Sequence, residues 1–205
     1  TERAAHFKFT FPDSETSYIL VDGFFKGSMV KIIPEERKII GYCRNNKAGV
    51  PDNFHNYFVV QFDKDFELNH TWADDWKLQE NSLNSEGEHV GAIIGFKTKR
   101  GEVVHAKVAS SFISPEQAQL NLSREIGKDS FETTKKKAKD AWETELSRIK
   151  IDDSNIDNVR TFYSCLYRVL LFSRKFYEFN ANNEVVHYSP YKGKFLQGTM
   201  FTVNG

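Results

Sequence analysis

Residues 108–171 constrain the fold more than any other stretch, because they carry the signals for three successive helices after a strand-like run. Ser114, followed by Pro115 and three residues later by Gln117, forms a capping box with proline at the first helical position. Gly127 ends this helix. Apolar residues recur on one face at a spacing of four: Ala118, Leu122 and Ile126. The first predicted helix therefore has a single buried face.

Two further helices are predicted after Gly127. Ser130 is a candidate N-cap for the second helix, whose apolar rhythm continues to Ile149. The lysine-rich run at 135–139 is interpreted as its solvated face. The third helix is predicted to begin near Asn155. Its predicted buried face consists of Val159, Phe162, Tyr163, Leu166, Val169 and Leu170.

Short segments with alternating apolar residues precede the helices, and turn-forming residues separate them. Residues 89–97 and 102–110 are predicted to pair as a hairpin. The other predicted strands are 6–11, 18–21, 29–33, 38–43, 57–62 and the less regular 66–76. Loops are predicted at 45–55, 82–88 and 172–191. The predicted fold class is therefore α+β, an antiparallel β-sandwich followed by helices.

Composition excludes some classes of function. Lysine plus arginine number 28 and aspartate plus glutamate also number 28, so the chain lacks the positive surplus that a main nucleic-acid partner requires. No apolar segment is long enough to span a membrane, and no signal peptide is visible. Cys43 and Cys165 lack metal-type spacing. Two buried thiols are the favoured interpretation, and a disulfide between them stays open.

The residues alone indicate no catalytic set. Motifs of serine hydrolases, phosphate-binding loops, zinc proteases and paired-cysteine sites are absent from the sequence. The histidines are scattered. His89 and His105 could meet across the predicted hairpin, where ordinary cross-strand packing is the favoured interpretation.

The most site-like cluster places Asp74 and Asp75 beside Trp72 and Trp76. Tryptophan faces can stack on sugar rings, and carboxylates accept hydrogen bonds from hydroxyl groups. The alternative is a surface turn with two partly buried aromatic anchors. Two classes of function stay open at this point. One is a carbohydrate-binding or structural sandwich module, and the other is part of an enzyme whose catalytic domain begins at the third helix.

Several segments, in order, resemble the bacterial α-mannosidases of glycoside hydrolase family 92. The tail KFLQGTMFTVNG resembles the segment just before the Trp-Asp-Thr motif of that family. The stretch 108–171 is the most specific part of the resemblance. The other matching segments are HFKFTFP, GYCR, NYFVVQFDKDF, VVHAKVASSFISPEQAQLNLSREI, AWETELSRIKI and TFYSCLYRVLL.

The resemblance implies an N-terminal β-sandwich, a helical linker and a catalytic (α/α)6 barrel. On this basis we expect a sandwich at 1–112 that is incomplete at its N-terminus, a helical linker at 113–152, and the truncated start of the catalytic domain at 153–205. The missing barrel of the same polypeptide would be the main packing partner.

The resemblance also implies calcium-dependent, inverting removal of mannose, commonly α-1,2-linked, from glycans. Inversion requires a general acid and a general base about 6.5–9.5 Å apart with water between them. The acid, the base and the calcium ligands of the family lie beyond this chain, so no catalytic residue or metal ligand is placed on it. By the same resemblance we expect a periplasmic or exported location.

Four residues are expected to contact substrate. Asn204 and Gly205 would abut the sugar site, and Trp72 and Trp76 would contribute to an outer sugar subsite. The chain by itself is expected to be inactive. The alternatives are a stand-alone carbohydrate-binding module and a scaffold domain without a ligand.

Overall fold

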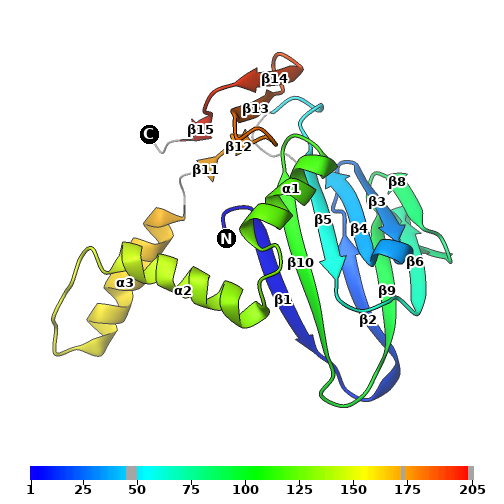
Figure 1. Ribbon diagram of the computed structural model, residues 1–205, viewed down its shortest axis with the longest axis horizontal. Helices are drawn as coiled ribbons and strands as arrows, with labels where there is room; N and C mark the ends of the chain where they lie inside the picture. The colour runs from blue at the N-terminus through cyan, green and yellow to red at the C-terminus, as the bar shows by residue number, and fades with distance from the viewer. Residues whose placement is uncertain (45–49, 172–173, 203–205) are drawn as a thin grey trace.

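The computed structural model describes residues 1–44, 50–171 and 174–202. Two antiparallel sheets lie face to face, helix α1 covers the outside of one sheet, and helices α2 and α3 extend away from the sandwich (Figure 1). The six-stranded sheet has the order β1 (Ala4–Thr10), β10 (Val103–Ser111), β5 (Asn56–Phe62), β4 (Lys38–Cys43), β3 (Ser28–Ile33) and β8 (Asn84–Gly87). The four-stranded sheet has the order β2 (Ser14–Asp22), β9 (Gly91–Thr98), β6 (Leu68–Ala73) and β7 (Lys77–Glu80).

The main core fills the space between the two sheets. Strand β3 points Val30 and Ile32 inward and Lys31 outward, which is the alternation expected of a sheet with one buried face. Aromatic residues such as Phe62 and Phe96 supply much of the buried area. The core members are Val30, Ile32, Ile39, Val60, Phe62, Val90, Ala92, Ile94, Phe96, Val104 and Ala106.

A second apolar cluster lies on the outer face of the six-stranded sheet, under α1 (Pro115–Glu125). Adjacent residues of β5 pack in different clusters, because Val60 faces the inner core and Val59 faces α1. Both are buried, so β5 is covered on both sides. The outer cluster consists of Ala4, Val59, Ala109, Ala118, Leu122 and Ile126.

The predicted start and end of α1 are confirmed. Ser114 Oγ accepts a hydrogen bond from the backbone N–H of Gln117 at 3.1 Å, and Gly127 follows the helix with φ +51°. The predicted second half of the capping box is wrong. The Gln117 side chain does not return to the N-cap; it donates to Asn121 Oδ1 and to the carbonyl of Phe179.

Helices α2 (Phe131–Leu146) and α3 (Ile156–Leu170) form a helical hairpin. Their caps are those predicted, Ser130 and Asn155. Trp142 and Tyr167 pack between them with ring centroids 4.5 Å apart. The predicted buried face of α3 is wrong for this chain, because no residue of α3 is buried. The sequence pattern identifies an apolar face, but in the described part of the chain α2 covers it only in part, so that Val159, Phe162, Tyr163 and Leu166 are half-buried.

Two other predictions are wrong. Residues 89–97 and 102–110 do not pair as a hairpin, because β9 bonds with β2 and β6 in one sheet, and β10 bonds with β1 and β5 in the other. Both strands place apolar residues in the core between the sheets, which requires them to face one another. Within 82–88, predicted as a loop, β8 pairs with β3.

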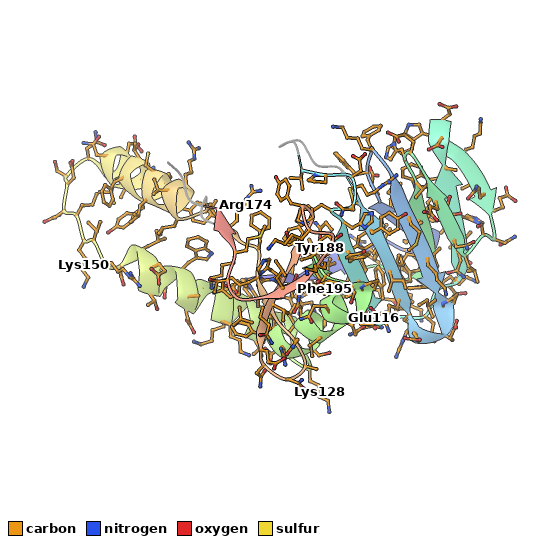
Figure 2. The ribbon with its side chains drawn as sticks, turned by 90° about the horizontal axis from the view of Figure 1, so that it is seen from above. Glu116, Lys128, Lys150, Arg174, Tyr188 and Phe195 are labelled. Atoms are coloured by element: carbon orange, nitrogen blue, oxygen red, sulfur yellow. The ribbon has the colours of Figure 1, made fainter. Side chains whose placement is uncertain are left out.

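The predicted loop at 172–191 instead contains short strands. Strands β12 (Glu178–Phe179), β13 (Val185–Ser189) and β14 (Lys194–Gln197) form a small sheet. Strands β11 (Arg174–Lys175) and β15 (Phe201–Thr202) pair beside it. In the view from above, Tyr188 and Phe195 of the small sheet lie between the helical hairpin and the sandwich (Figure 2). In the described residues, no helix is both long and apolar enough to cross a membrane.

Candidate functional site

The structure brings Trp72 and Trp76 together. Trp72 is the next-to-last residue of β6, and Trp76 lies in the one-turn 3₁₀ helix that links β6 to β7. Their rings stack with centroids 4.5 Å apart and planes inclined by 21°. Asp75 and Trp76 have φ values of +63° and +60°, a left-handed backbone that is uncommon outside glycine. This tight turn allows the second indole ring to lie against the first.

The two tryptophans differ in what they can touch. Trp72 is 3% exposed and Trp76 is 64% exposed. A Cβ atom at Gly91 would lie only 2.4 Å from the Trp72 ring, so glycine makes room for this indole. Trp72 is therefore an internal support. Trp76 is the ring that a ligand can reach.

We define Trp72, Trp76 and His89 as the tryptophan cluster. His89 packs against both tryptophans. Its ring lies edge-on to both indoles, at 4.7 and 5.2 Å between centroids. The Nε2 atom lies 2.8 Å from Asp22 Oδ1, and the backbone N–H donates to Asp74 Oδ1 at 2.7 Å. Each of these bonds joins segments far apart in the sequence. The predicted meeting of His89 with His105 is wrong, because His89 lies just before β9 and His105 lies on β10, in the opposite sheet.

Exposed apolar side chains surround the cluster. Phe25 packs on the His89 ring with centroids 4.0 Å apart, and Phe24 lies against Phe25. Phe24, Phe25 and Leu78 are each about half exposed. An exposed aromatic ring with carboxylates nearby can stack on the apolar face of a sugar and accept hydrogen bonds from its hydroxyl groups.

A second feature, missed from sequence, is a buried carboxylate where the small sheet meets the sandwich. Glu178 is 1% exposed. Its Oε1 accepts from the Ser111 hydroxyl at 3.0 Å and from the backbone N–H of Phe112 at 2.8 Å. Its Oε2 accepts from Asn121 Nδ2 at 2.7 Å. We call this set, Glu178, Ser111, Phe112 and Asn121, the junction.

Arg124 extends the junction. Its guanidinium donates to the carbonyls of Phe179 and Asn180 and to Asn183 Oδ1. Around these polar groups, the rings of Phe54, Phe112, Phe176 and Tyr188 pack on one another. One sequence signal for the junction was available. Gln117 and Asn121 are polar residues four apart on the buried side of α1, where an apolar face is otherwise expected.

The remaining predicted site residues stand as follows. Asn204 and Gly205 lie outside the described residues. Cys43 is half-buried on β4, Cys165 is exposed on α3, and no disulfide joins them. In the part of the chain that the structure describes, no three His, Cys, Asp or Glu side chains gather as a metal site.

Comparison with known proteins gives consistent matches. Residues 1–111 match the glycosyl hydrolase family 92 N-terminal domain, and residues 117–205 match the glycosyl hydrolase family 92 catalytic domain. No curated protein matches the chain. A solved family 92 inverting mannosidase from Bacteroides thetaiotaomicron is 40% identical, with a TM-score of 0.92 over 99% of this chain.

Two further solved structures share the fold. One is a family 92 α-mannosidase from the same organism in complex with mannoimidazole, at 24% identity and a TM-score of 0.78 over 98% of this chain. The other is a family 92 glycosyl hydrolase, at 21% identity and a TM-score of 0.80 over 98% of this chain. This chain spans 27% of the length of each of these three proteins. Because the two matched domains together account for nearly every residue, the chain belongs to glycosyl hydrolase family 92.

Proposed function

We propose that this chain is part of a calcium-dependent, inverting exo-α-mannosidase that removes α-1,2-linked mannose from glycans. The observation that carries the proposal is the match to an inverting mannosidase at 40% identity over 99% of the chain. The catalytic acid, the catalytic base and the calcium ligands are assigned to the remainder of the polypeptide. The 205-residue chain alone is then inactive.

In this proposal the chain forms the base on which the catalytic barrel is built. Residues 1–112 supply the sandwich, residues 113–152 the linker, and residues 153–205 the first part of the catalytic domain. The junction supports this division of roles, because Glu178 ties the last part of the chain to Ser111 of β10 and to Asn121 of α1. It fixes the direction in which the chain leaves the sandwich.

We assign sugar contact to Trp76 and support of its ring to Trp72. Trp76 is exposed and Trp72 is buried, which favours this assignment of the two roles. Asp75 is the neighbouring carboxylate available to a sugar hydroxyl. Asn204 and Gly205 remain assigned to the edge of the sugar site. Export to the periplasm or the cell surface is part of the same proposal.

The test is mannose release from α-1,2-linked mannobiose, with calcium and with a chelator. Two polypeptides are compared, the 205-residue chain and a longer polypeptide that carries it. We expect no release from the chain and calcium-dependent release from the longer polypeptide. Release by the chain alone would place a complete acid–base pair within it and overturn the assignment of roles. A longer polypeptide without activity in either condition would overturn the mannosidase proposal.

The second candidate is a carbohydrate-binding module, which the exposed Trp76 ring favours. It predicts saturable binding of mannobiose by the chain itself. Trp76→Ala should abolish that binding, and Val169→Ala, a truncation of an exposed apolar residue on α3 and outside this site, should leave it unchanged. Binding that survives Trp76→Ala would show that this ring does not bind the sugar.

A further inference from the structure

A cavity of about 530 Å³ lies on the outer face of the six-stranded sheet, beside α1. Its volume is in the range of cavities that hold small molecules. The end of β5, the middle of β10, α1 and the turn after α1 form its walls. Lys128, in the turn after α1, lies at the outer rim of this cavity (Figure 2). The lining residues are Gln61, Phe62, Asp63, His105, Lys107, Gln119, Leu122, Ser123, Gly127 and Lys128.

Two ammonium groups in this lining have no carboxylate partner among the described residues. Lys107 Nζ donates to the carbonyl of Gly127 at 2.8 Å, which fixes the ammonium group at the cavity wall and leaves it two further donors. Lys128 forms no ion pair with any residue that the structure describes. The acidic residue next to it in sequence, Asp129, is engaged by Lys137 at 2.5 Å.

The one carboxylate in the lining is already occupied. Asp63 Oδ1 accepts from the backbone N–H of His105 at 2.8 Å, and Oδ2 lies 2.7 Å from Nδ1 of the same residue. Because Asp63 engages Nδ1, the nitrogen of His105 left for a ligand is Nε2. Burial, followed by the charges of Lys107 and His105, lowers the pKa of the neighbouring His6.

One neutral group in the lining is not held by the protein. Gln119 Oε1 is buried and has no hydrogen-bond partner among the described residues. By contrast, the amide of Gln61 is occupied, since Nε2 donates to the carbonyls of Glu36 and Arg37. Since Gln119 Nε2 likewise makes no hydrogen bond to a described residue, rotation of the carboxamide can direct its N–H₂ group into the cavity.

We propose that this cavity binds a small oxyanion, a phosphate or carboxylate group, between Lys107 and Lys128. The lysines supply charge-assisted hydrogen bonds, and the Gln119 amide supplies a neutral donor. Leu122 and Phe62 line the apolar part of the cavity. This inference does not depend on the proposed mannosidase activity.

The test is titration of the chain with sodium phosphate, followed by the backbone amide signals in NMR at constant ionic strength. We expect saturable shifts confined to the cavity lining, led by Gly127 and Lys128. Lys128→Gln should weaken binding about tenfold, the loss expected for one charge-assisted hydrogen bond. This residue is exposed on a turn, so the variant should fold. A parallel titration with acetate establishes which of the two groups is preferred.

Lys135→Gln is the matched control, because this lysine is exposed on α2 and does not line the cavity. It should bind phosphate as the parent chain does. Shifts that do not saturate, or that are equal in the two variants, would overturn the proposal. So would saturation of the same amides by the neutral sugar methyl α-mannoside when phosphate and acetate have no effect.

Discussion

The buried carboxylate of Glu178 accepts a hydrogen bond from Asn121 at 2.7 Å and so joins β12 to α1. Two more donors, the Ser111 hydroxyl and the Phe112 N–H, converge on the same carboxylate. These three hydrogen bonds are all donated to the carboxylate and engage both of its oxygens. The junction is therefore the point at which the attachment of the small sheet can be tested.

Glu178→Gln should destabilise the chain by about 2–3 kcal/mol, because the new amide group turns an N–H₂ toward existing donors. The effect should be largest in the small sheet, measured as faster amide hydrogen exchange in β12–β14. Glu184→Gln is the control, since that carboxylate is exposed and, among the described residues, bonds only with the nearby Asn180. Equal exchange in the two variants would show that the junction does not hold the sheet.

Trp72→Ala and Trp76→Ala should differ sharply in stability. Removing the buried indole of Trp72 should lower the free energy of unfolding by about 3–5 kcal/mol, since it leaves a cavity against Gly91. Removing the exposed ring of Trp76 should cost about 1 kcal/mol or less. Urea unfolding measures both changes. Equal losses would contradict the division into support and surface ring.

Ser114→Ala should lower the free energy of unfolding by about 1 kcal/mol, because it removes the hydroxyl that caps α1. The control is Ser123→Ala in the same helix. In the part of the chain that the structure describes, that hydroxyl bonds only to the carbonyl of Gln119, and it is exposed, so the loss should stay within about 0.5 kcal/mol. Thermal or urea unfolding distinguishes the two, and a loss at Ser123 as large as that at Ser114 would contradict the capping role.

Acid should destabilise the chain partly through His6. Burial lowers the pKa of His6 below its ordinary value of 6.5, so the unfolded chain takes up a proton at a higher pH than the folded chain does. The stability is fully present above pH 6.5 and is lost as the pH falls through the lowered folded pKa. Urea unfolding at about pH 7.5 and about pH 5.5 measures the difference.

His6→Gln should reduce this pH dependence without removing it. His55, whose pKa is lowered by burial and then by the charge of Arg44, contributes in the same direction. His187→Gln serves as the control, because that residue lies on β13, outside the sandwich. An unchanged pH dependence in His6→Gln would contradict the assignment.

Much of the fold could be predicted from local patterns. The helix starts at Ser114, Ser130 and Asn155 each depend on a side chain that bonds within its own turn, so the sequence carries the information. Strands β3, β4 and β5 are short apolar runs bounded by turn-forming residues, a signal that likewise lies within each segment.

The failures involve partners far apart in the chain. Whether β9 pairs with β10 or faces it across the core depends on β2 and β1, which compete as neighbours. Strand β8 has little apolar content and exists because the edge of β3 is available to it. Glu178 is one of many glutamates in the sequence, and only the fold brings its donors to it.

The candidate site was found in part. The proximity of Trp72 and Trp76 in sequence predicted that they would meet, but not which of them would be buried. That outcome depends on Gly91 of the neighbouring strand and on the left-handed backbone of Trp76.

The strand order has a consequence for how the chain is made. Among the described strands of the sandwich, β1 is synthesised before the others, and its neighbour in the sheet, β10, is synthesised last. The apolar residues of β1 therefore stay exposed to solvent until almost the whole sandwich has left the ribosome. Pairings so distant in sequence close slowly and leave strand edges open to aggregation meanwhile. A chaperone that shields residues 4–10 during this interval should raise the yield of folded protein.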